Sequence, residues 1–136
     1  MSVPVELRRL DTVVRARGTA AYVLTVNDAG APHVVHAEVV VDGACLVAAV
    51  GARTADNARG RPRVSLLYPS RDAADYSLIV DGLATVDVTA DGARLSVSPT
   101  RAVLHRPVAA ADPSASPCGS DCIPIALGSP TRAMPS

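Results

Sequence analysis

The chain has 136 residues, of which 49% are hydrophobic and 19% charged, a balance that favours one folded domain and excludes a disordered or collagen-like chain. Its 13 basic residues balance 13 acidic ones, so no global positive field attracts nucleic acid or an acidic membrane surface. No stretch approaches the roughly 18 consecutive apolar residues of a membrane span. We therefore expect no nucleic-acid partner and no membrane partner.

The N-terminus and the cysteine count favour the cytoplasm. The first residues contain no basic segment followed by an apolar one, so no secretory signal is predicted. Cys45, Cys118 and Cys122 are too few for a disulfide scaffold, and their odd number suits a reducing compartment. Cys45 falls inside a predicted strand and is expected to be a small core residue.

The first predicted element is an amphipathic helix. Its apolar residues recur at spacings of three and four, charged residues occupy the other face, and Gly18 is expected to end it. The apolar residues are Val3, Leu7, Leu10, Val13 and Val14.

From residue 20 onward, β-branched runs separated by turn residues predict a meander of three strands. Asp42 and Gly43 lie between two valine-rich runs. They predict a two-residue type I′ turn, because both central positions of that turn need a positive φ. The strands are expected over residues 21–26, 32–41 and 45–50.

A short helix and three more strands follow. Thr54 is a suitable N-cap for a polar helix that Gly60 ends, and a bulge is expected at Asp81-Gly82 inside a long strand. Six strands with an N-terminal helix and one short helix after the third strand cannot form a parallel α/β sheet. The predicted fold is mainly β, a six-stranded antiparallel barrel. The last three strands are expected over residues 64–68, 76–88 and 93–97.

Six of the 11 prolines lie from Pro107 onward, so we predict a domain over residues 1–106 and a Pro-rich C-terminal tail over 107–136, either extended against the barrel or a partner, or disordered. Cys118 and Cys122 in this tail are separated by three residues, which differs from the spacing of most zinc sites. With His105 they are a weak alternative for a metal or haem-edge site, and no metal site is predicted.

Three stretches of the sequence, residues 22–33, 51–67 and 76–84, together resemble a known family in their residues, order and spacing. The middle one is the most specific, because a polar helical turn runs into the strand that begins Pro62-Arg63-Val64. Over roughly residues 6 to 98 the chain resembles the pyridoxamine 5′-phosphate oxidase-like family of flavin-binding split β-barrels. The resemblance implies a homodimer that binds FMN, or a deazaflavin coenzyme, in two clefts at the subunit interface.

The resemblance also implies where the cofactor phosphate is held, namely by the loop and helix after the third strand. Arg53 and Thr54 occupy the matching positions, and Asn57 matches an Asn frequent in the subgroup near the deazaflavin binders. Many members have Lys where this chain has Thr54. A helix N-terminus with an adjacent arginine suits a phosphate on physical grounds as well. Without the resemblance, the same segment reads as a solvated connection between strands.

Further cofactor contacts are implied along the second strand and at the start of the fifth. His36, Ala37 and Glu38 are expected to lie along the isoalloxazine ring, mostly through backbone groups, and Ser77 to reach the cofactor with its side chain. His33 and His36 are three apart on one strand, so they face opposite sides and cannot chelate one metal ion together. Either both are ordinary structural histidines, or one of them lines the cleft.

Three functions fit these observations. The first is an FMN-dependent oxidoreductase acting on a small-molecule substrate, with a deazaflavin-dependent reductase as its variant. In such an enzyme the bound flavin carries the hydride, so no side-chain nucleophile is required, and no catalytic residue is predicted. The second is a non-catalytic flavin- or haem-binding protein. The third is a structural dimer whose cleft holds no cofactor.

Overall fold

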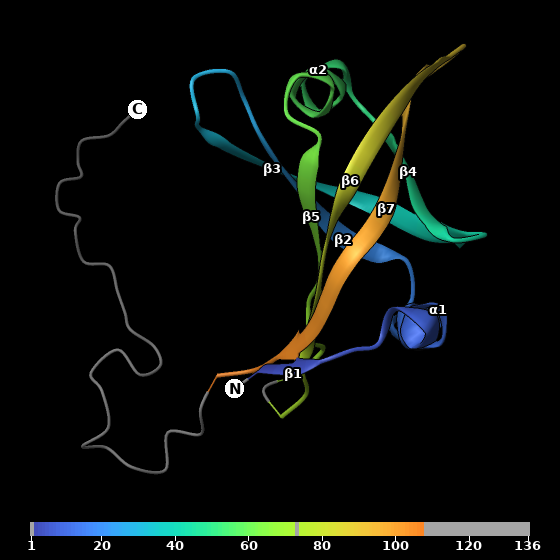
Figure 1. The fold of residues 1–136 in the computed structure, drawn as a ribbon, viewed down its shortest axis with the longest axis vertical. Coiled ribbons are helices and arrows are strands. Elements are labelled where there is room, and N and C mark those ends of the chain that lie inside the picture. The colour runs from blue at the N-terminus through green and yellow to red at the C-terminus, as the bar shows by residue number, and fades with distance from the viewer. Residues whose placement is uncertain (1, 73, 108–136) are drawn as a thin grey trace, which may run out of the picture. The chain divides into compact units, whose positions relative to one another are not determined.

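In the computed structural model, which describes residues 2–72 and 74–107, six antiparallel strands close into a barrel (Figure 1). The neighbouring strands run in the order β7-β4-β3-β2-β5-β6, and pairing of β6 with β7 completes the closure. The mainly β, six-stranded antiparallel barrel predicted from the sequence is therefore confirmed. The barrel strands are β2 (Ala20–Val26), β3 (Pro32–Asp42), β4 (Cys45–Val50), β5 (Arg63–Tyr68), β6 (Ser77–Thr89) and β7 (Gly92–His105).

Helical segments lie at the two ends of the barrel. The 3-10 helix η1 (Leu7–Arg9) and helix α1 (Leu10–Arg17) precede β2, and helix α2 (Ala52–Gly60) follows β4 at the opposite end (Figure 1). The short helix after the third predicted strand is thus confirmed. Its N-cap is Gly51, not Thr54, because the backbone is extended at Gly51 and its carbonyl already accepts the first helical bond from Ala55 N at 3.1 Å.

The N-terminal helix begins later than predicted. Ser2–Pro4 forms an additional strand, β1, which pairs with the end of β7 outside the barrel, with Val3 opposite Leu104. The helical spacing that included Val3 was misleading, because Val3 belongs to a strand. The buried residues of α1 are Leu10 and Val14. Pro4 is tolerated because it stands in an edge strand.

The β6–β7 hairpin is longer than predicted. Strand β7 continues past Pro99 to His105, whereas the prediction ended it at Val97. Pro99 lies opposite Gly82, where the register shifts between Asp81 and Gly82, so the predicted bulge is confirmed. Proline is accepted at this point because a bulge removes the need for its missing backbone N–H.

The β3–β4 hairpin forms as predicted, but its turn is one residue later. Asp42 pairs with Cys45, so the two-residue loop consists of Gly43 and Ala44. Gly43 has φ +62°, a left-handed conformation that a glycine adopts without steric cost.

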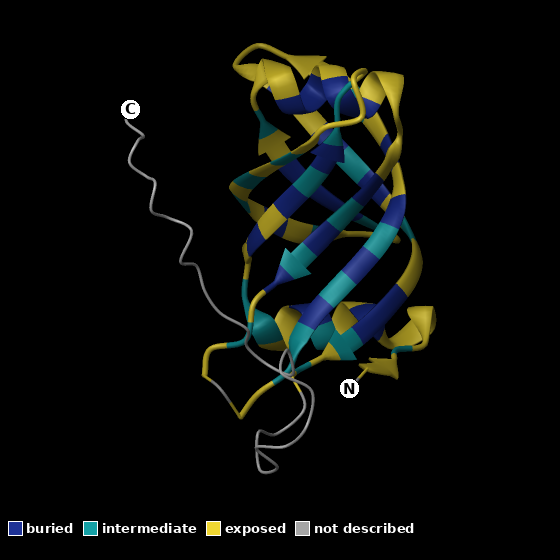
Figure 2. Ribbon diagram, turned by 90° about the vertical axis from the view of Figure 1, so that its left-hand side faces the viewer, coloured by how far each residue is buried: buried dark blue, intermediate teal, exposed yellow. Residues whose placement is uncertain are grey.

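Alternating side chains of the strands fill the barrel, as Figure 2 shows by its alternating buried and exposed segments. The core is almost wholly aliphatic, and Val23, Leu66, Leu78 and Leu95 are fully buried in it. Tyr68 is the one aromatic side chain in the core of the described residues, and its hydroxyl donates a hydrogen bond to the Val39 carbonyl at 3.2 Å. Burial of aliphatic side chains therefore supplies most of the stabilisation of the barrel.

The predicted tail, with Cys118 and Cys122, lies outside the described residues except for Pro107. The boundary between residues 106 and 107 therefore stays a prediction. His105, the third residue of the alternative metal site, ends β7, and its Nδ1 lies 3.1 Å from Ser2 Oγ. Among the described residues, no helix is long and apolar enough to cross a membrane.

We expect Gly82→Ala to destabilise the barrel by about 1–3 kcal/mol, because overpacking a filled site forces neighbouring atoms to move. A Cβ at Gly82 would lie 2.5 Å from the Ser98 carbonyl oxygen and 2.6 Å from Val97 Cγ1. Urea unfolding measures the change. Ala20→Ser, which adds one atom at an exposed strand position, is the control. Equal unfolding midpoints for the two variants would show that the bulge accommodates a side chain.

Candidate functional site

The barrel has a break along one edge of β3. Strand β3 pairs with β2 from Pro32 to Glu38, but with β4 only from Val39 to Asp42. The second edge of the Pro32–Glu38 segment therefore has no strand partner among the described residues. Backbone N–H and C=O groups along such an edge remain available to hydrogen-bond a ligand.

A groove lies between this free edge and helix α2. It consists of two adjoining depressions of about 380 and 600 Å³, which share His33, Ala52 and Arg53 in their walls. The first is walled by β3 and the end of β4, and the second by the β2–β3 connection and α2. The groove thus joins a strand edge to a helix N-terminus.

Arg53 supplies the positive charge of the groove. It stands in the first turn of α2, is exposed, and makes no ion pair among the described residues. The backbone N–H groups of Ala52, Arg53 and Thr54 precede the first helical hydrogen bond and lack an acceptor within the helix. A cation and a helix N-terminus therefore meet at one point, which suits an anionic group. Asp56, which also lines the groove, is engaged by Arg59 at 3.0 Å.

Thr54 and Asn57 stand on the side of α2 that faces the barrel. Thr54 is only 2% exposed and Asn57 8%. The Asn57 Nδ2 donates a hydrogen bond of 3.1 Å to Thr25 Oγ1 on β2, and Thr25 is itself buried. Both predicted residues line the groove, but their side chains point largely into the protein. Their contact with a cofactor stays a prediction.

The predicted residues of β3 divide between two positions. His36 and Ala37 line the groove, as does His33. His36 also makes an edge-to-face contact with Tyr22 on the outer surface, with ring centroids 5.2 Å apart. Glu38 does not line the groove, and it accepts a 3.4 Å hydrogen bond from Thr19 Oγ1.

Ser77 is not near the groove within one chain. It begins β6 opposite His105, which also pairs with β1, and β1 lies at the end of the barrel away from α2 (Figure 1). The Ser77 Oγ accepts a hydrogen bond of 3.1 Å from the Ser70 backbone N–H. Ser77 can therefore complete the groove only if it comes from a second subunit.

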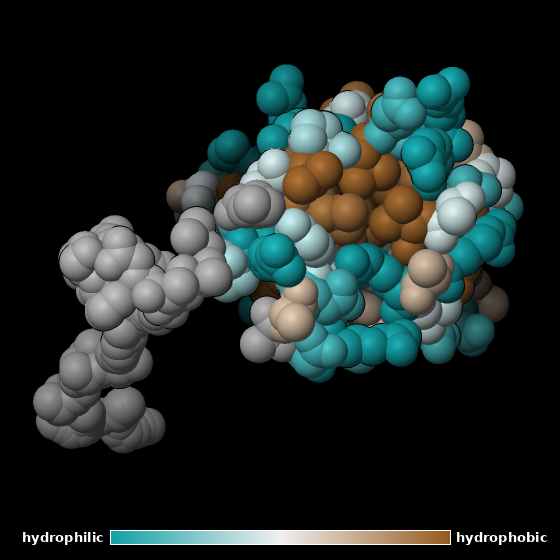
Figure 3. All heavy atoms as spheres, turned by 90° about the horizontal axis from the view of Figure 1, so that it is seen from below, coloured by the Kyte–Doolittle hydropathy of each residue, from teal (hydrophilic) through white to brown (hydrophobic). Residues whose placement is uncertain are grey.

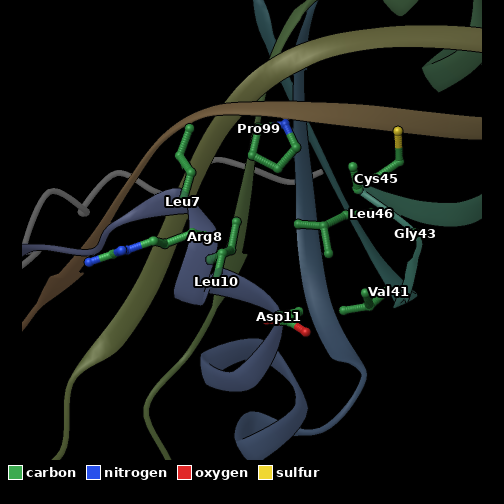
Figure 4. A pocket seen from close by; sticks show the side chains of 10 residues that line it. Leu7, Arg8, Leu10, Asp11, Val41, Gly43, Cys45, Leu46 and Pro99 are labelled. Carbon is green, nitrogen blue, oxygen red and sulfur yellow. The ribbon is translucent and has the colours of Figure 1, made fainter.

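A third depression, of about 460 Å³, lies between η1, the β3–β4 turn and β7 (Figure 4). None of the predicted site residues lines it. Cys45 lines this depression. The prediction that Cys45 belongs to the core is wrong, because the residue is only half-buried. Its Sγ lies 3.7 Å from Ser98 Oγ. Its position at the first residue of β4, beside the turn, keeps it from full burial. Figure 3, which views the α1 end of the molecule, shows a hydrophobic area ringed by hydrophilic residues.

Thr25 and Asp56 are two of the polar residues in the groove region that sequence reasoning missed. Thr25 gave no signal, because a single Thr in a valine-rich strand reads as an ordinary strand residue. Its role depends on Asn57, which is 32 positions away and reaches it only after α2 docks on β2. Asp56 belonged to a polar helix with no signal that set it apart from its neighbours.

No family model matches the sequence. Two curated relatives, both uncharacterised proteins, Mb0449c of Mycobacterium bovis and MT0457 of Mycobacterium tuberculosis, are each 40% identical over 117 residues. Each alignment covers 76% of this chain and 82% of the relative.

Solved structures share the fold at low sequence identity. A candidate pyridoxamine 5′-phosphate oxidase from Listeria innocua has a TM-score of 0.60 at 16% identity, over 70% of this chain and 97% of that one. The FAD-binding protein of Mycobacterium smegmatis has a TM-score of 0.59 at 17% identity, over 78% and 100%. An F420 reductase has a TM-score of 0.54 at 20% identity, over 63% and 90%.

The same fold also occurs in HutZ, a haem storage protein of Vibrio cholerae, with a TM-score of 0.57 at 16% identity, over 73% of this chain and 94% of that one. Proteins whose names refer to FAD, to F420 and to haem thus share one architecture. The chain belongs to the family of the two mycobacterial proteins, and its fold is the split β-barrel of the pyridoxamine 5′-phosphate oxidase-like proteins.

Proposed function

We propose that this protein is a flavin-dependent oxidoreductase of the cytoplasm, which binds FMN in the groove and acts on a small-molecule substrate. The proposal rests on one observation: the free edge of β3 and the N-terminus of α2, which bears Arg53, line the same groove. FMN has one anionic end and one planar ring edged with hydrogen-bonding groups. The two walls of the groove offer partners of these two kinds.

The phosphate fits the α2 end of the groove. A positive charge in the first turn is unfavourable for an isolated helix, by about 0.3–1 kcal/mol, because it faces the positive end of the helix dipole. Arg53 nevertheless stands there, and no acidic residue occupies that turn. A bound phosphate relieves this repulsion and receives both the guanidinium and the free backbone N–H groups.

The ring fits the β3 end. Backbone groups of residues 33 to 38 on the free edge can bond its polar rim, and His36 and Ala37 line the same space. A bound flavin supplies hydride transfer, and the protein supplies orientation and electrostatics. The groove contains no pair of side chains arranged as nucleophile and base, so the described residues act by binding and orienting.

Deazaflavin and haem are the alternative ligands, because the fold occurs in an F420 reductase and in a haem storage protein. The groove offers His33 and His36 as imidazole groups, but the arginine at the helix N-terminus favours a phosphate-bearing cofactor. The absorbance spectrum of purified protein separates a flavin from a deazaflavin and from a haem Soret band.

We further propose that two copies form a homodimer over the outer face of β2 and β3. Val34 is 52% exposed, Val40 42% and Tyr22 38%, and all three lie on this one face. Large exposed apolar side chains that share one face of a protein are typical of an interface. A dimer also allows Ser77 of one subunit to approach the groove of the other.

Asn57 contributes to the site by holding α2 in position, since little of its side chain is exposed for direct contact with a ligand. Its hydrogen bond to Thr25 joins the middle of α2 to β2 inside the protein. The orientation of the helix decides where Arg53 points. Asn57 and Thr25 are therefore positioning residues for the phosphate end of the groove.

Arg53→Ala should weaken FMN binding by roughly ten- to a hundredfold, because a charge-assisted hydrogen bond to the phosphate is lost. Quenching of flavin fluorescence during a titration measures the affinity. Arg94→Ala is the control, since Arg94 pairs with Asp42 at 2.8 Å and lines neither part of the groove. Unchanged FMN affinity in the Arg53 variant would refute the phosphate assignment.

Val34→Asp combined with Val40→Asp should convert the dimer into a monomer, because each change buries a charge in the proposed interface. Light scattering should show half the mass of the wild type, with an unchanged circular dichroism spectrum. Val88→Asp, at a position 77% exposed near the tip of the β6–β7 hairpin, should leave the mass unchanged. A wild-type protein that is already monomeric at micromolar concentration would contradict the dimer.

Thr25→Val should lower the free energy of unfolding by about 1–3 kcal/mol, because the Asn57 amide loses its acceptor in a buried place. It should also weaken FMN binding, since α2 is held less firmly. Thr25→Ser, which keeps the hydroxyl, should bind FMN nearly as well as the wild type. If Thr25→Val loses stability but binds FMN with unchanged affinity, the bond is structural only.

A further inference from the structure

A separate pocket of about 420 Å³ lies at the other end of α2, on the outer surface of β2, β5 and β6. It shares no lining residue with the groove described above. It is also independent of the third depression, which lies beside η1. Its walls are formed by Val26, Gly60, Arg61, Pro62, Arg63 and Leu83.

Strand register brings the floor of this pocket together. Arg63 pairs directly with Leu83, so the two side chains stand side by side on the outer face of the barrel. The last pair between β2 and β5 is Leu24 with Ser65, and Val26, two residues further along β2, lines the same pocket as Arg63. Leu83 is 47% exposed. A cation thus lies between two aliphatic side chains on the surface of the single chain.

The pocket carries positive charge. Arg63 makes no ion pair among the described residues, and no acidic residue lines the pocket. The Arg61 Nη2 donates a 3.2 Å hydrogen bond to the Asp28 backbone carbonyl, which holds this second guanidinium in place. The Asp28 carboxylate lies beside Gly60 and offsets part of the charge at this end of the pocket. The pocket therefore contains two positive charges and an apolar floor.

We propose that this pocket binds a small molecule with one carboxylate, phosphate or sulfonate group on an apolar body. The volume falls in the range of about 300–1,000 Å³ that is usual for small-molecule sites. Guanidinium groups bond planar and tetrahedral oxyanions through paired N–H donors, while Val26, Pro62 and Leu83 cover the apolar part. The site is distinct from the cofactor groove and does not depend on the proposed redox activity.

The test uses the full-length protein and the anionic fluorophore 8-anilinonaphthalene-1-sulfonate. We expect one molecule bound per chain, with amide chemical shifts that change at Val26, Gly60 and Leu83 in the NMR spectrum. The uncharged analogue N-phenyl-1-naphthylamine should bind about tenfold or more weakly, because it cannot bond the guanidinium groups. Saturating FMN should leave the affinity for the fluorophore unchanged, which separates this site from the groove.

Variants of the pocket sharpen the test. Arg63→Ala should weaken binding of the fluorophore about tenfold or more, and Arg63→Lys, which keeps the charge, should bind more tightly than Arg63→Ala. Leu83→Ser should weaken binding too, since apolar contact is lost. Arg94→Ala and Val88→Ser, which change exposed residues elsewhere on the barrel, are the matched controls and should bind like the wild type.

Two results would overturn the proposal. Equal affinity in Arg63→Ala and the wild type, or shift changes confined to other residues, would show that the fluorophore binds elsewhere. A Leu83→Ser protein with a changed mass in light scattering would show that a second copy of the chain covers the pocket, not a small molecule.

Discussion

The change of partner along β3 is the constraint on which the site depends. At Val39, β3 stops pairing with β2 on one edge and begins to pair with β4 on the other. Tyr68 fixes this point from inside the barrel, because its hydroxyl bonds the Val39 carbonyl. A tyrosine phenol is a protonated donor at neutral pH, and burial raises the pKa of Tyr68 still further from neutrality. The barrel closes around the junction, yet the first seven of the 11 residues of β3 keep a free edge.

Helix α2 lies beside that free edge, and the two elements enclose a groove whose two walls differ. The chain leaves β4 at Val50 and enters the helix at once through Gly51, so the helix N-terminus necessarily lies beside β3. The buried bond between Asn57 and Thr25 sets the rotation of the helix about its own axis. Arg53 then faces the groove while Thr54 faces the protein. The helix dipole disfavours a cation at the N-terminus, and a bound anion would offset this repulsion.

Most of the fold could be predicted from local sequence patterns. The errors arose where the structure depends on contacts between residues far apart in the sequence. Valine-rich runs and turn residues identified all six barrel strands, and the Asp81-Gly82 pair identified the bulge. Val3 was misread because helical spacing cannot reveal that the end of β7, about a hundred positions later, offers a strand partner. The last strand was predicted to end at Val97, because the acceptance of Pro99 within a strand depends on Gly82 across the hairpin. The groove residues were found mainly by resemblance, while Thr25 depends on a contact that no local pattern encodes.

The distribution of charge explains how a chain of zero net charge can present two cationic sites. Several carboxylates are taken by arginines elsewhere, as in the pairs of Arg94 with Asp42 and Arg101 with Asp81. Arg53 and Arg63, near the two ends of α2, have no such partner among the described residues. A helical rise of 1.5 Å per residue separates Arg53 from Arg61, at the far end of the helix, by about 12 Å. A single small oxyanion cannot bridge that distance, so the two ends of one short helix can serve two different ligands.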